Sequence, residues 1–397
     1  MTNEQNQIFL LIETSRQFGR SILQGVIRWS HRYGPYRLHA SAGHLPQKLP
    51  KFTDTQHIGF IGRISVPGLT ELIRSHHVPT ILLEPNTREQ VAIQQELGLG
   101  AITINARATG QMGADYFFDH GYERFAFCGF ANRLWSEQRQ AAFVDAITAR
   151  GFSCSCYEPP DKECQWPGDR VRLKKWIKSL PQPIGMMTCD DDRARQVLDV
   201  CEEEGMDVPS GISVLGAADD ELLCELASVP LSSIAFDLEK AGFDAMVLLS
   251  GLMDGSITEP HNIEIDPLWV TPRISTDYMA QKDKLVTRAL RFIRSNYLRP
   301  IAVADIVENL DVSRRSLENH FLAATGHTLM DDINRRRFQR AKQLLLTTNN
   351  SIAKICMESG FVSYRSMLGV FVAELGYTPN EFRDKHGRSV TDENEHL

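Results

Sequence analysis

Short apolar runs alternate with amphipathic stretches over the first two thirds of the chain. The runs IFLLIE at 8–13 and HIGFIG at 57–62 predict buried strands, and the stretch 18–34 carries apolar residues at helical spacing and ends at Gly34. Further strands are predicted at 36–42, 80–85 and 101–105. Because strands and helices alternate in this way in parallel sheets covered by helices, the pattern predicts an α/β fold, whose ligands bind at the carboxyl ends of the strands.

The same alternation begins again after residue 105. A helix is predicted at 108–122, a strand at 124–130, a helix at 139–152 and a strand at 154–160. The alternation continues through 170–183, 184–190, 192–209 and 212–221, and a last helix is predicted at 238–255. Two α/β lobes in succession, with later elements returning to the first, predict one two-lobed domain over residues 1–280.

The remaining chain has an all-helical pattern in which one unit is written twice. A short helix ending at Leu310, a three-residue turn and a second helix capped by Ser313 form a helix-turn-helix pattern. The second copy has Gly360 as a helix stop and a second helix from Ser363. The helical stretch 329–347 between them would be about 28 Å long at 1.5 Å per residue. Since successive major grooves lie ~34 Å apart, one chain could place two helices in successive grooves.

Each second helix is predicted to bury an apolar pair four residues apart, Leu317 with Phe321 and Met367 with Phe371. This spacing turns residues of base-reading types outward. These are Arg314, Arg315, Glu318 and Asn319 in the first copy, and Tyr364 and Arg365 in the second. In the connecting stretch, residues 335–337 are all arginine. Arg336 is predicted to contact a DNA phosphate, and a solvated face is the alternative.

The run from SRRSLENHF through RRRFQRAKQLLLTT, SIAKICMESGF and GYTPNEFR resembles the arabinose-regulator (AraC/XylS) family of bacterial transcription factors. By position, the family's groove-reading residues fall on the outward residues named above, except Arg314. The second copy departs from the family pattern, because Leu368, Gly369, Val370 and Val372 stand where polar or basic residues are usual. We therefore expect the first copy to carry most of the direct readout.

The first domain resembles the type I periplasmic-binding-protein fold and, more closely, the sensory core of lactose-repressor-like regulators. The resemblance lies in HGYERFAFCGF, CDDDRARQVLDVCEEEGMDVPSGISVLG and PLSSIAFDLEKAG. With the C-terminal module, the whole order from Ile8 to Arg383 resembles the xylose operon regulator group. The resemblance implies double-stranded DNA and a sugar, xylose or another pentose, as partners. It also implies a homodimer formed through the sensor, and contact with RNA polymerase if the protein is an activator.

A neutral sugar is held by carboxylates, amides and arginines, with an aromatic ring against its apolar face, and such groups are expected where the loops of both lobes meet. The candidates are Ser15, Arg16, Phe18, Trp135, Arg139, Asp191 and Asp219. Two alternatives stay open: Trp135 packs the lobes together, and residues 190–192 only cap the following helix. Position 218 is commonly a ligand-binding aspartate in the family and is Ala218 here. Either Asp219 takes over its role or the effector differs.

Charge divides the chain in the same place as the pattern. The net charge is −7, yet residues 284–385 carry 16 Lys/Arg against 10 Asp/Glu, whereas residues 1–283 carry 26 against 37. A basic module is therefore joined to an acidic one, as DNA binding requires. The predicted division is a sensor and dimerisation domain at 1–280, a linker at 281–284, a DNA-binding domain at 285–385 and a flexible acidic tail at 386–397.

Other classes of function lack their motifs. The chain has no G-x-G-x-x-G, P-loop or G-x-S-x-G sequence and no histidine pair at metal-binding spacing, so we expect no enzyme, cofactor or metal. Among eight cysteines, Cys154, Cys156 and Cys164 are either reduced residues at a strand end or a metal or redox cluster. With no signal peptide or membrane span expected, the predicted location is the cytoplasm.

The predicted function is sequence-specific DNA binding that regulates sugar catabolism under the control of a sugar bound between the two lobes. Two alternatives remain. The first is a regulator of the same kind with a different effector or none. The second is a sugar-binding protein whose second helix-turn-helix unit no longer supports specific DNA binding. Residues 378–381, Thr-Pro-Asn-Glu, are expected to form a helix capping box and so to be structural.

Overall fold

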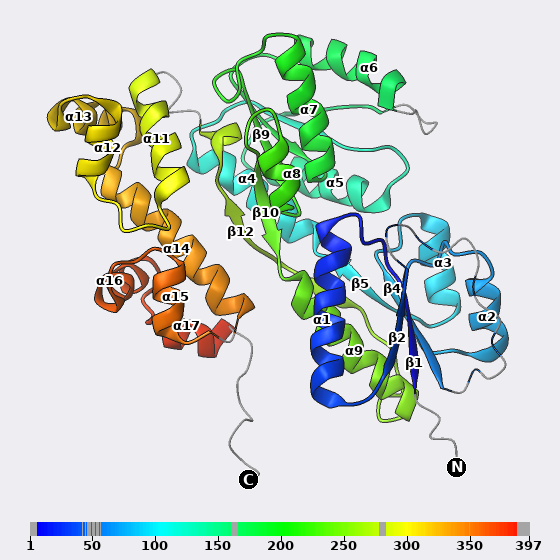
Figure 1. The fold of residues 1–397 in the computed structure, drawn as a ribbon. Helices are drawn as coiled ribbons and strands as arrows, with labels where there is room; N and C mark the ends of the chain where they lie inside the picture. The colour runs from blue at the N-terminus through cyan, green and yellow to red at the C-terminus, as the bar shows by residue number, and fades with distance from the viewer. Residues whose placement is uncertain are drawn as a thin grey trace. The chain divides into compact units, whose positions relative to one another are not determined.

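The computed structural model describes residues 6–41, 57–159, 166–277, 283–348 and 350–386, with the single residues 43, 45, 49, 52 and 55. The chain divides into two compact units, Met1–Thr276 and Asp277–Leu397 (Figure 1). Residues 281 and 282 of the predicted linker and 387–397 of the predicted tail lie outside the described residues. The first unit is the predicted α/β domain and the second is all helical.

The first lobe is a parallel six-stranded sheet with the order β11-β5-β4-β3-β1-β2. Its strands are β1 Gln7–Leu11, β2 Arg37–Ala40, β3 Ile58–Gly62, β4 Thr80–Leu83, β5 Gly100–Ile104 and β11 Ile263–Ile265. Its helices are α1 Gln17–Tyr33, α2 Leu69–His76, α3 Arg88–Glu96 and α9 Leu238–Asp254. Helices α1 and α9 share one core with the strands, while α2 packs on a separate cluster. Strands buried on both faces need continuous apolar runs, which explains why the runs were readable in the sequence.

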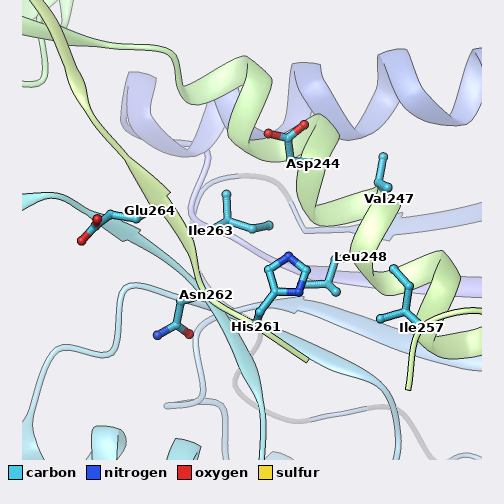
Figure 2. A pocket seen from close by; sticks show the side chains of 8 residues that line it. All are labelled: Asp244, Val247, Leu248, Ile257, His261, Asn262, Ile263 and Glu264. Atoms are coloured by element: carbon cyan, nitrogen blue, oxygen red, sulfur yellow. The ribbon is translucent and has the colours of Figure 1, made fainter. Parts of the chain in front are cut away.

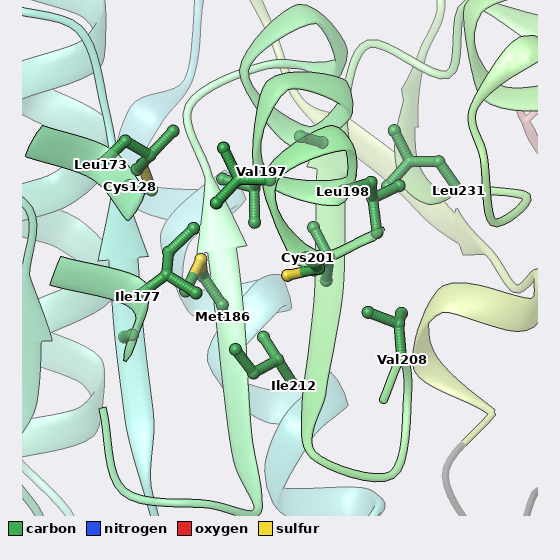
Figure 3. Close-up of a cluster of buried hydrophobic side chains, with 14 of the residues drawn as sticks. Cys128, Leu173, Ile177, Met186, Val197, Leu198, Cys201, Val208, Ile212 and Leu231 are labelled. Carbon is green, nitrogen blue, oxygen red and sulfur yellow. The ribbon is translucent and has the colours of Figure 1, made fainter. Parts of the chain in front are cut away.

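The second lobe repeats the plan with the strand order β12-β10-β9-β8-β6-β7, in which only β12 is antiparallel to its neighbour. Its strands are β6 Phe125–Cys128, β7 Cys154–Cys156, β8 Ile184–Thr188, β9 Ile212–Ala217, β10 Ser232–Phe236 and β12 Pro267–Thr271. Its helices are α4 Ala106–Asp119, α5 Leu134–Thr148, α6 Trp166–Ser179, α7 Asp191–Glu203 and α8 Glu221–Leu226, and a 3-10 turn, η1 Ile274–Thr276, follows β12. Figure 3 shows the core that α6 and α7 share with the sheet, including Leu173, Val197 and Ile212.

The chain passes from one lobe to the other at residues 105, 237 and 266 in the described structure. Helix α9 thus returns to the first lobe, as predicted from the order of elements, and β11 joins it there. In the first unit, the sequence pattern did not predict α2, α3, α8, β10, β11 or β12.

The second unit contains seven described helices: α11 Lys284–Asn296, α12 Val303–Leu310, α13 Arg314–Thr325, α14 Leu329–Thr347, α15 Ile352–Glu358, α16 Tyr364–Leu375 and α17 Pro379–His386. Two helix-turn-helix pairs, α12–α13 and α15–α16, are joined by α14, which confirms the predicted arrangement. The Ser313 and Ser363 hydroxyls each accept a hydrogen bond from the backbone N–H three residues on, at 3.2 Å. These caps fix where the second helices begin.

Helices α1 and α9 approach each other so closely that glycine is required at two positions. A Cβ atom on Gly25 would lie 1.9 Å from the Glu239 carbonyl oxygen, and one on Gly242 would lie 2.0 Å from the Ile22 carbonyl oxygen. Both obstacles are backbone atoms, which cannot rotate away. The contact therefore sets the spacing between the two helices.

Gly242→Ala is expected to lower the free energy of unfolding of the first unit by about 3 kcal/mol, because the helices must separate to admit the methyl group. All five tryptophans lie in this unit, so tryptophan fluorescence in urea reports on it. Gly369→Ala adds the same methyl group where nothing lies within 4 Å, and it should leave this transition unchanged. An unaltered urea-unfolding midpoint for Gly242→Ala would show that the close contact between α1 and α9 does not limit the stability of the first unit.

Candidate ligand site and nucleic-acid interface

One carboxylate, Asp220, joins the two lobes at the end of β9. Its Oδ1 accepts the Leu223 N–H at 3.3 Å and so caps α8 in its own lobe. Its Oδ2 accepts the Gln17 N–H of α1, in the other lobe, at 3.0 Å. The N-cap residue of α1 is Arg16, which makes no side-chain cap. Asp220 therefore supplies the negative charge that the start of α1 favours.

Arg16, a predicted ligand residue, lies at the same boundary. Its Nη2 is 2.8 Å from the Asp192 Oδ2 of the second lobe, with the two side chains 58% and 23% exposed. Because both remain partly solvated, this ion pair contributes at most ~1 kcal/mol. A bound ligand could replace it at little cost.

Trp135 and Arg139, one helical turn apart, come together on α5. The Arg139 guanidinium carbon is 5.7 Å from the Trp135 ring centre and 5.9 Å from that of Phe236. Its Nη1 donates to the Cys189 carbonyl oxygen. The side chain is buried, and its Nε has no hydrogen-bond partner among the described residues. A buried donor without a partner is costly unless a ligand satisfies it.

Two charged residues of the first lobe, Glu84 and Arg63, were missed in the sequence, and Glu84 interacts electrostatically with Arg139. Glu84 directly follows β4 with a left-handed φ of 39°, and burial raises the pKa of its carboxyl while Arg63 and Arg139 oppose the rise. Arg63 Nη1 donates to the carbonyl oxygens of Leu83 and Glu84 at 3.1 and 3.0 Å. Arg63 directly follows the predicted strand at 57–62, and Glu84 lies near the end of the predicted strand at 80–85. Both positions are therefore at the carboxyl ends of strands, where ligands of such sheets bind.

The three aspartates at 190–192 have three different roles, of which Asp192 pairs with Arg16. Asp190 accepts the Arg193 N–H at 2.8 Å and caps α7, which is the structural alternative considered for this run. Asp191 is buried and accepts hydrogen bonds from the Ser233 hydroxyl at 2.5 Å and the Asp220 N–H at 2.9 Å. Burial raises the pKa of Asp191 to about 7 and that of Asp190 to about 6. Asp191 thus supports the loop that carries Asp220.

Asp219 turns away from the lobe boundary. Its carboxylate accepts hydrogen bonds from Arg273 Nη1 at 2.7 Å and from the Thr271 hydroxyl at 2.6 Å, which ties it to β12. The φ value of Asp219 is 51°, and that of the preceding Ala218 is 141°. Both carboxylate oxygens are therefore held by residues of the second lobe. Arg273, its partner, had no signal in the sequence.

The other two predicted ligand residues, Ser15 and Phe18, lie near Arg16. Ser15 is exposed, whereas Phe18 packs against the core of the first lobe. A separate cavity of about 370 Å³ opens between α9 and β11 (Figure 2). It is lined by Asp244, Val247, Leu248, Ile257, His261, Asn262, Ile263 and Glu264, and by none of the predicted ligand residues.

In the second unit, the predicted outward residues are on the solvent side of their helices. Leu317, Phe321, Met367 and Phe371 are fully buried, so α13 and α16 present their opposite faces to solvent. Arg315, Asn319 and Arg365 are exposed, as is Tyr364, while Arg314 Nε pairs with Glu318 Oε1 at 2.8 Å. The surface is therefore able to contact base edges.

The arginine run on α14 does not behave as predicted at Arg336. Its side chain is only 16% exposed and its Nε is 2.7 Å from Asp332 Oδ2. The salt bridge one helical turn away holds the side chain against the protein. Arg337 is buried and donates to the Tyr297 and Arg299 carbonyl oxygens at 2.9 and 2.7 Å. Arg335 is exposed and is the member of the run available to a phosphate.

Residues 378–381 form the expected capping box. The Thr378 N–H donates to Glu381 Oε2 at 2.7 Å, and the Glu381 N–H donates to the Thr378 hydroxyl at 3.2 Å. Cys154 and Cys156 are free thiols, and Cys164 lies outside the described residues. Among described residues, no group of three or more His, Cys, Asp or Glu side chains is placed to hold a metal. None of the described helices is long and apolar enough to cross a membrane.

Asp191→Asn is expected to remove a pH-dependent cost of folding. Because the folded pKa of about 7 is above the unfolded value of 3.8, ionisation of the buried carboxyl destabilises the fold as pH rises from 4 to 7, by up to about 4 kcal/mol. Asparagine does not ionise, so its stability relative to wild type should increase over this range in urea unfolding. A difference that is constant with pH would contradict the burial cost.

Known proteins share both parts of this chain. Residues 114–276 match the periplasmic binding protein-like domain, and residues 306–385 match a helix-turn-helix domain. A solved structure of the xylose-binding transcription activator XylR is 24% identical, has a TM-score of 0.61 and covers 98% of this chain and 100% of its own. That likeness shows that the fold is shared over nearly the full length.

Two curated relatives have the same name, xylose operon regulatory protein. The one from Haemophilus influenzae is 29% identical over 395 residues, covering 96% of this chain and 99% of its own length. The one from Escherichia coli K12 is 31% identical over 270 residues, covering 67% of this chain and 69% of its own. These relatives are transcription regulators and not enzymes. As the sequence motifs predicted, the chain belongs to the family of xylose operon regulatory proteins.

Proposed function

We propose that this chain is a sequence-specific DNA-binding regulator of xylose catabolism, controlled by a sugar bound between the lobes of its first unit. One observation carries the proposal: polar groups of both lobes meet at the carboxyl ends of the strands, in a chain that continues into a double helix-turn-helix unit. A ligand-controlled regulator needs a sensor domain joined to a DNA-binding domain, and this chain contains both. The chain acts in the cytoplasm, where operator DNA is available.

The effector would be held by groups from both lobes. Arg139 offers an unpaired donor beside the Trp135 ring, and Glu84 offers acceptors from the opposite lobe. A sugar has paired hydroxyls for these groups and an apolar face for the ring. Ala218 contributes no carboxylate, and Asp219 is bonded elsewhere. Glu84 and Arg139, rather than the loop after β9, would therefore set the choice of sugar.

The effector can change DNA binding only if it favours one arrangement of the lobes over another. The Arg16–Asp192 and Gln17–Asp220 contacts would change when the lobes move. A homodimer formed through the first unit would then present two second units to adjacent half-sites. If the regulator is an activator, RNA polymerase is a further partner.

On DNA, α13 would provide the direct readout through Arg315, Glu318 and Asn319. Arginine and asparagine side chains make bidentate hydrogen bonds to guanine and adenine edges. Arg335, not Arg336, would contact a phosphate, because Arg336 is occupied by Asp332. Phosphate contacts position the protein and carry the salt dependence, while base contacts specify sequence.

D-Xylose is expected to raise the melting temperature of the full-length protein, since a ligand at a hundredfold excess over Kd stabilises the folded state by about 2.7 kcal/mol. L-Arabinose, D-glucose and sugar acids serve as the comparison panel in the same thermal melts. Arg139→Met keeps the apolar length of the side chain but removes its donors, and it should weaken xylose binding at least about tenfold. A rise with another sugar alone would assign a different effector, and no rise with any sugar would contradict effector control.

Arg315→Ala should cost about 1 to 3 kcal/mol on a selected operator and much less on random duplex, because a base contact is lost. The matched control is Arg335→Ala, which should weaken both duplexes alike and reduce the salt slope by about 1. Both are measured by fluorescence anisotropy at several salt concentrations. Equal losses on both duplexes for Arg315→Ala would exclude Arg315 as a base reader.

A further inference from the structure

The two helix-turn-helix units follow each other at a constant register of 50 residues. Ser313 and Ser363 cap the second helices, and both α13 and α16 are 12 residues long. Both end at a glycine in the left-handed region, Gly326 with a φ of 73° and Gly376 with a φ of 72°. The fully buried positions coincide as well, with Phe321 equivalent to Phe371. Helix α16 is therefore the structural counterpart of α13.

The equivalence identifies which residues of α16 occupy the groove-facing positions. The five outward positions are Arg314, Arg315, Glu318, Asn319 and Leu322 in α13, and Tyr364, Arg365, Leu368, Gly369 and Val372 in α16. The polar pair Glu318–Asn319 is thus replaced by Leu368–Gly369. The last position is apolar in both helices, with Leu322 50% and Val372 49% exposed. Helix α16 keeps two outward polar residues, Tyr364 and Arg365. Its other outward positions form an apolar surface, which we call the α16 outer face: Leu368, Gly369 and Val372.

The fold of the second unit does not require this composition. A Cβ atom on Gly369 would have nothing within 4 Å, and its φ is not positive. Glycine inside a helix costs ~1 kcal/mol relative to alanine, so the position is destabilising where it stands. Val372 is half exposed although a polar residue would be solvated there at no cost. A requirement outside the folded chain accounts for Gly369 and Val372 better than packing does, while Leu368 beside them is half-buried.

The thymine methyl group fits that requirement. It is the apolar group on the major-groove edge of a base pair, and it is recognised by apolar side chains. Helices α13 and α16 lie at the same edge of the second unit, with α14 passing between the two pairs (Figure 1). The exposed Arg365, on the same helix, supplies positive charge beside the α16 outer face.

We propose that α16 enters a major groove and reads thymine methyl groups, with Leu368 and Val372 contacting the methyls and Gly369 allowing the helix backbone to approach the base edges closely. The proposal rests on the proposed DNA-binding function and specifies what the helix-turn-helix pair α15–α16 recognises. The pair α12–α13 would read mainly hydrogen-bonding groups, and the pair α15–α16 would read methyl groups. One half of the operator would then contain thymines at fixed positions.

Deoxyuridine tests this directly, because it pairs like thymine but lacks the methyl group. The probe is the tightest duplex that full-length protein with D-xylose selects from a random-sequence pool, with each thymine replaced singly. At two positions in one half-site, deoxyuridine should weaken binding about fourfold, which corresponds to the ~0.8 kcal/mol of one buried methyl group. Leu368→Ala and Val372→Ala should each remove the sensitivity at one of these positions.

Met357→Ala is the control, since Met357 is a 69% exposed apolar residue on α15 rather than on α16. It should leave both affinity and deoxyuridine sensitivity unchanged. Gly369→Ala should raise the thermal stability of the second unit, followed by circular dichroism, and weaken the selected duplex more than random duplex. Higher stability together with weaker binding of the selected duplex would show that the added methyl group hinders the approach to DNA and does not impair folding.

Three results would overturn the proposal. The first is that deoxyuridine does not weaken binding in either half-site, and the second is that its effect persists in both Leu368→Ala and Val372→Ala. The third is a footprint that covers a single major groove. The last would assign the α16 outer face to a protein partner. If Arg315→Ala still relaxes sequence preference in these cases, the proposed DNA-binding function stands without methyl reading. Failure to select any duplex would overturn both.

Discussion

The hydrogen bond from the Gln17 N–H to the Asp220 carboxylate is the constraint on which the arrangement of the first unit depends. One carboxylate caps α8 in its own lobe and supplies the start of α1 in the other with the acceptor that Arg16 does not provide. Asp191 in turn holds the Asp220 backbone N–H. The lobes are thus joined at the strand ends by a few polar contacts. Such contacts are individually weak, so a ligand that bonds to both lobes can reset their arrangement.

The way in which the chain leaves the first unit makes lobe position relevant to the DNA reader. The 3-10 turn η1 is buried in the second lobe, where the Ser275 hydroxyl donates to the Val214 carbonyl oxygen at 2.6 Å and accepts the Ser232 N–H at 2.8 Å. Thr276, the last residue of the unit, bonds to the Tyr116 hydroxyl at 2.8 Å. The point from which the second unit is connected therefore moves with the second lobe and not with the first.

Periodicity predicted the strands and helices that are long and buried, and failed where tertiary contacts decide. Strand β11 has three residues and α3 buries none, so neither has a readable pattern. In the ligand site, a strand end located Arg16. It did not give the direction of the Asp219 carboxylate, which depends on Arg273, 54 residues away. The prediction that Arg336 contacts a DNA phosphate likewise failed, because Asp332 binds that side chain.

Sugar binding and DNA binding would be coupled through the arrangement of the lobes. Coupling is reciprocal in free energy, so the direct measurement is a closed cycle: operator affinity with and without saturating D-xylose, and D-xylose affinity with and without saturating operator. Both affinities are expected to change by the same factor, between about 5-fold and 150-fold for typical coupling. Operator affinity that is unaffected by a bound sugar would contradict this coupling.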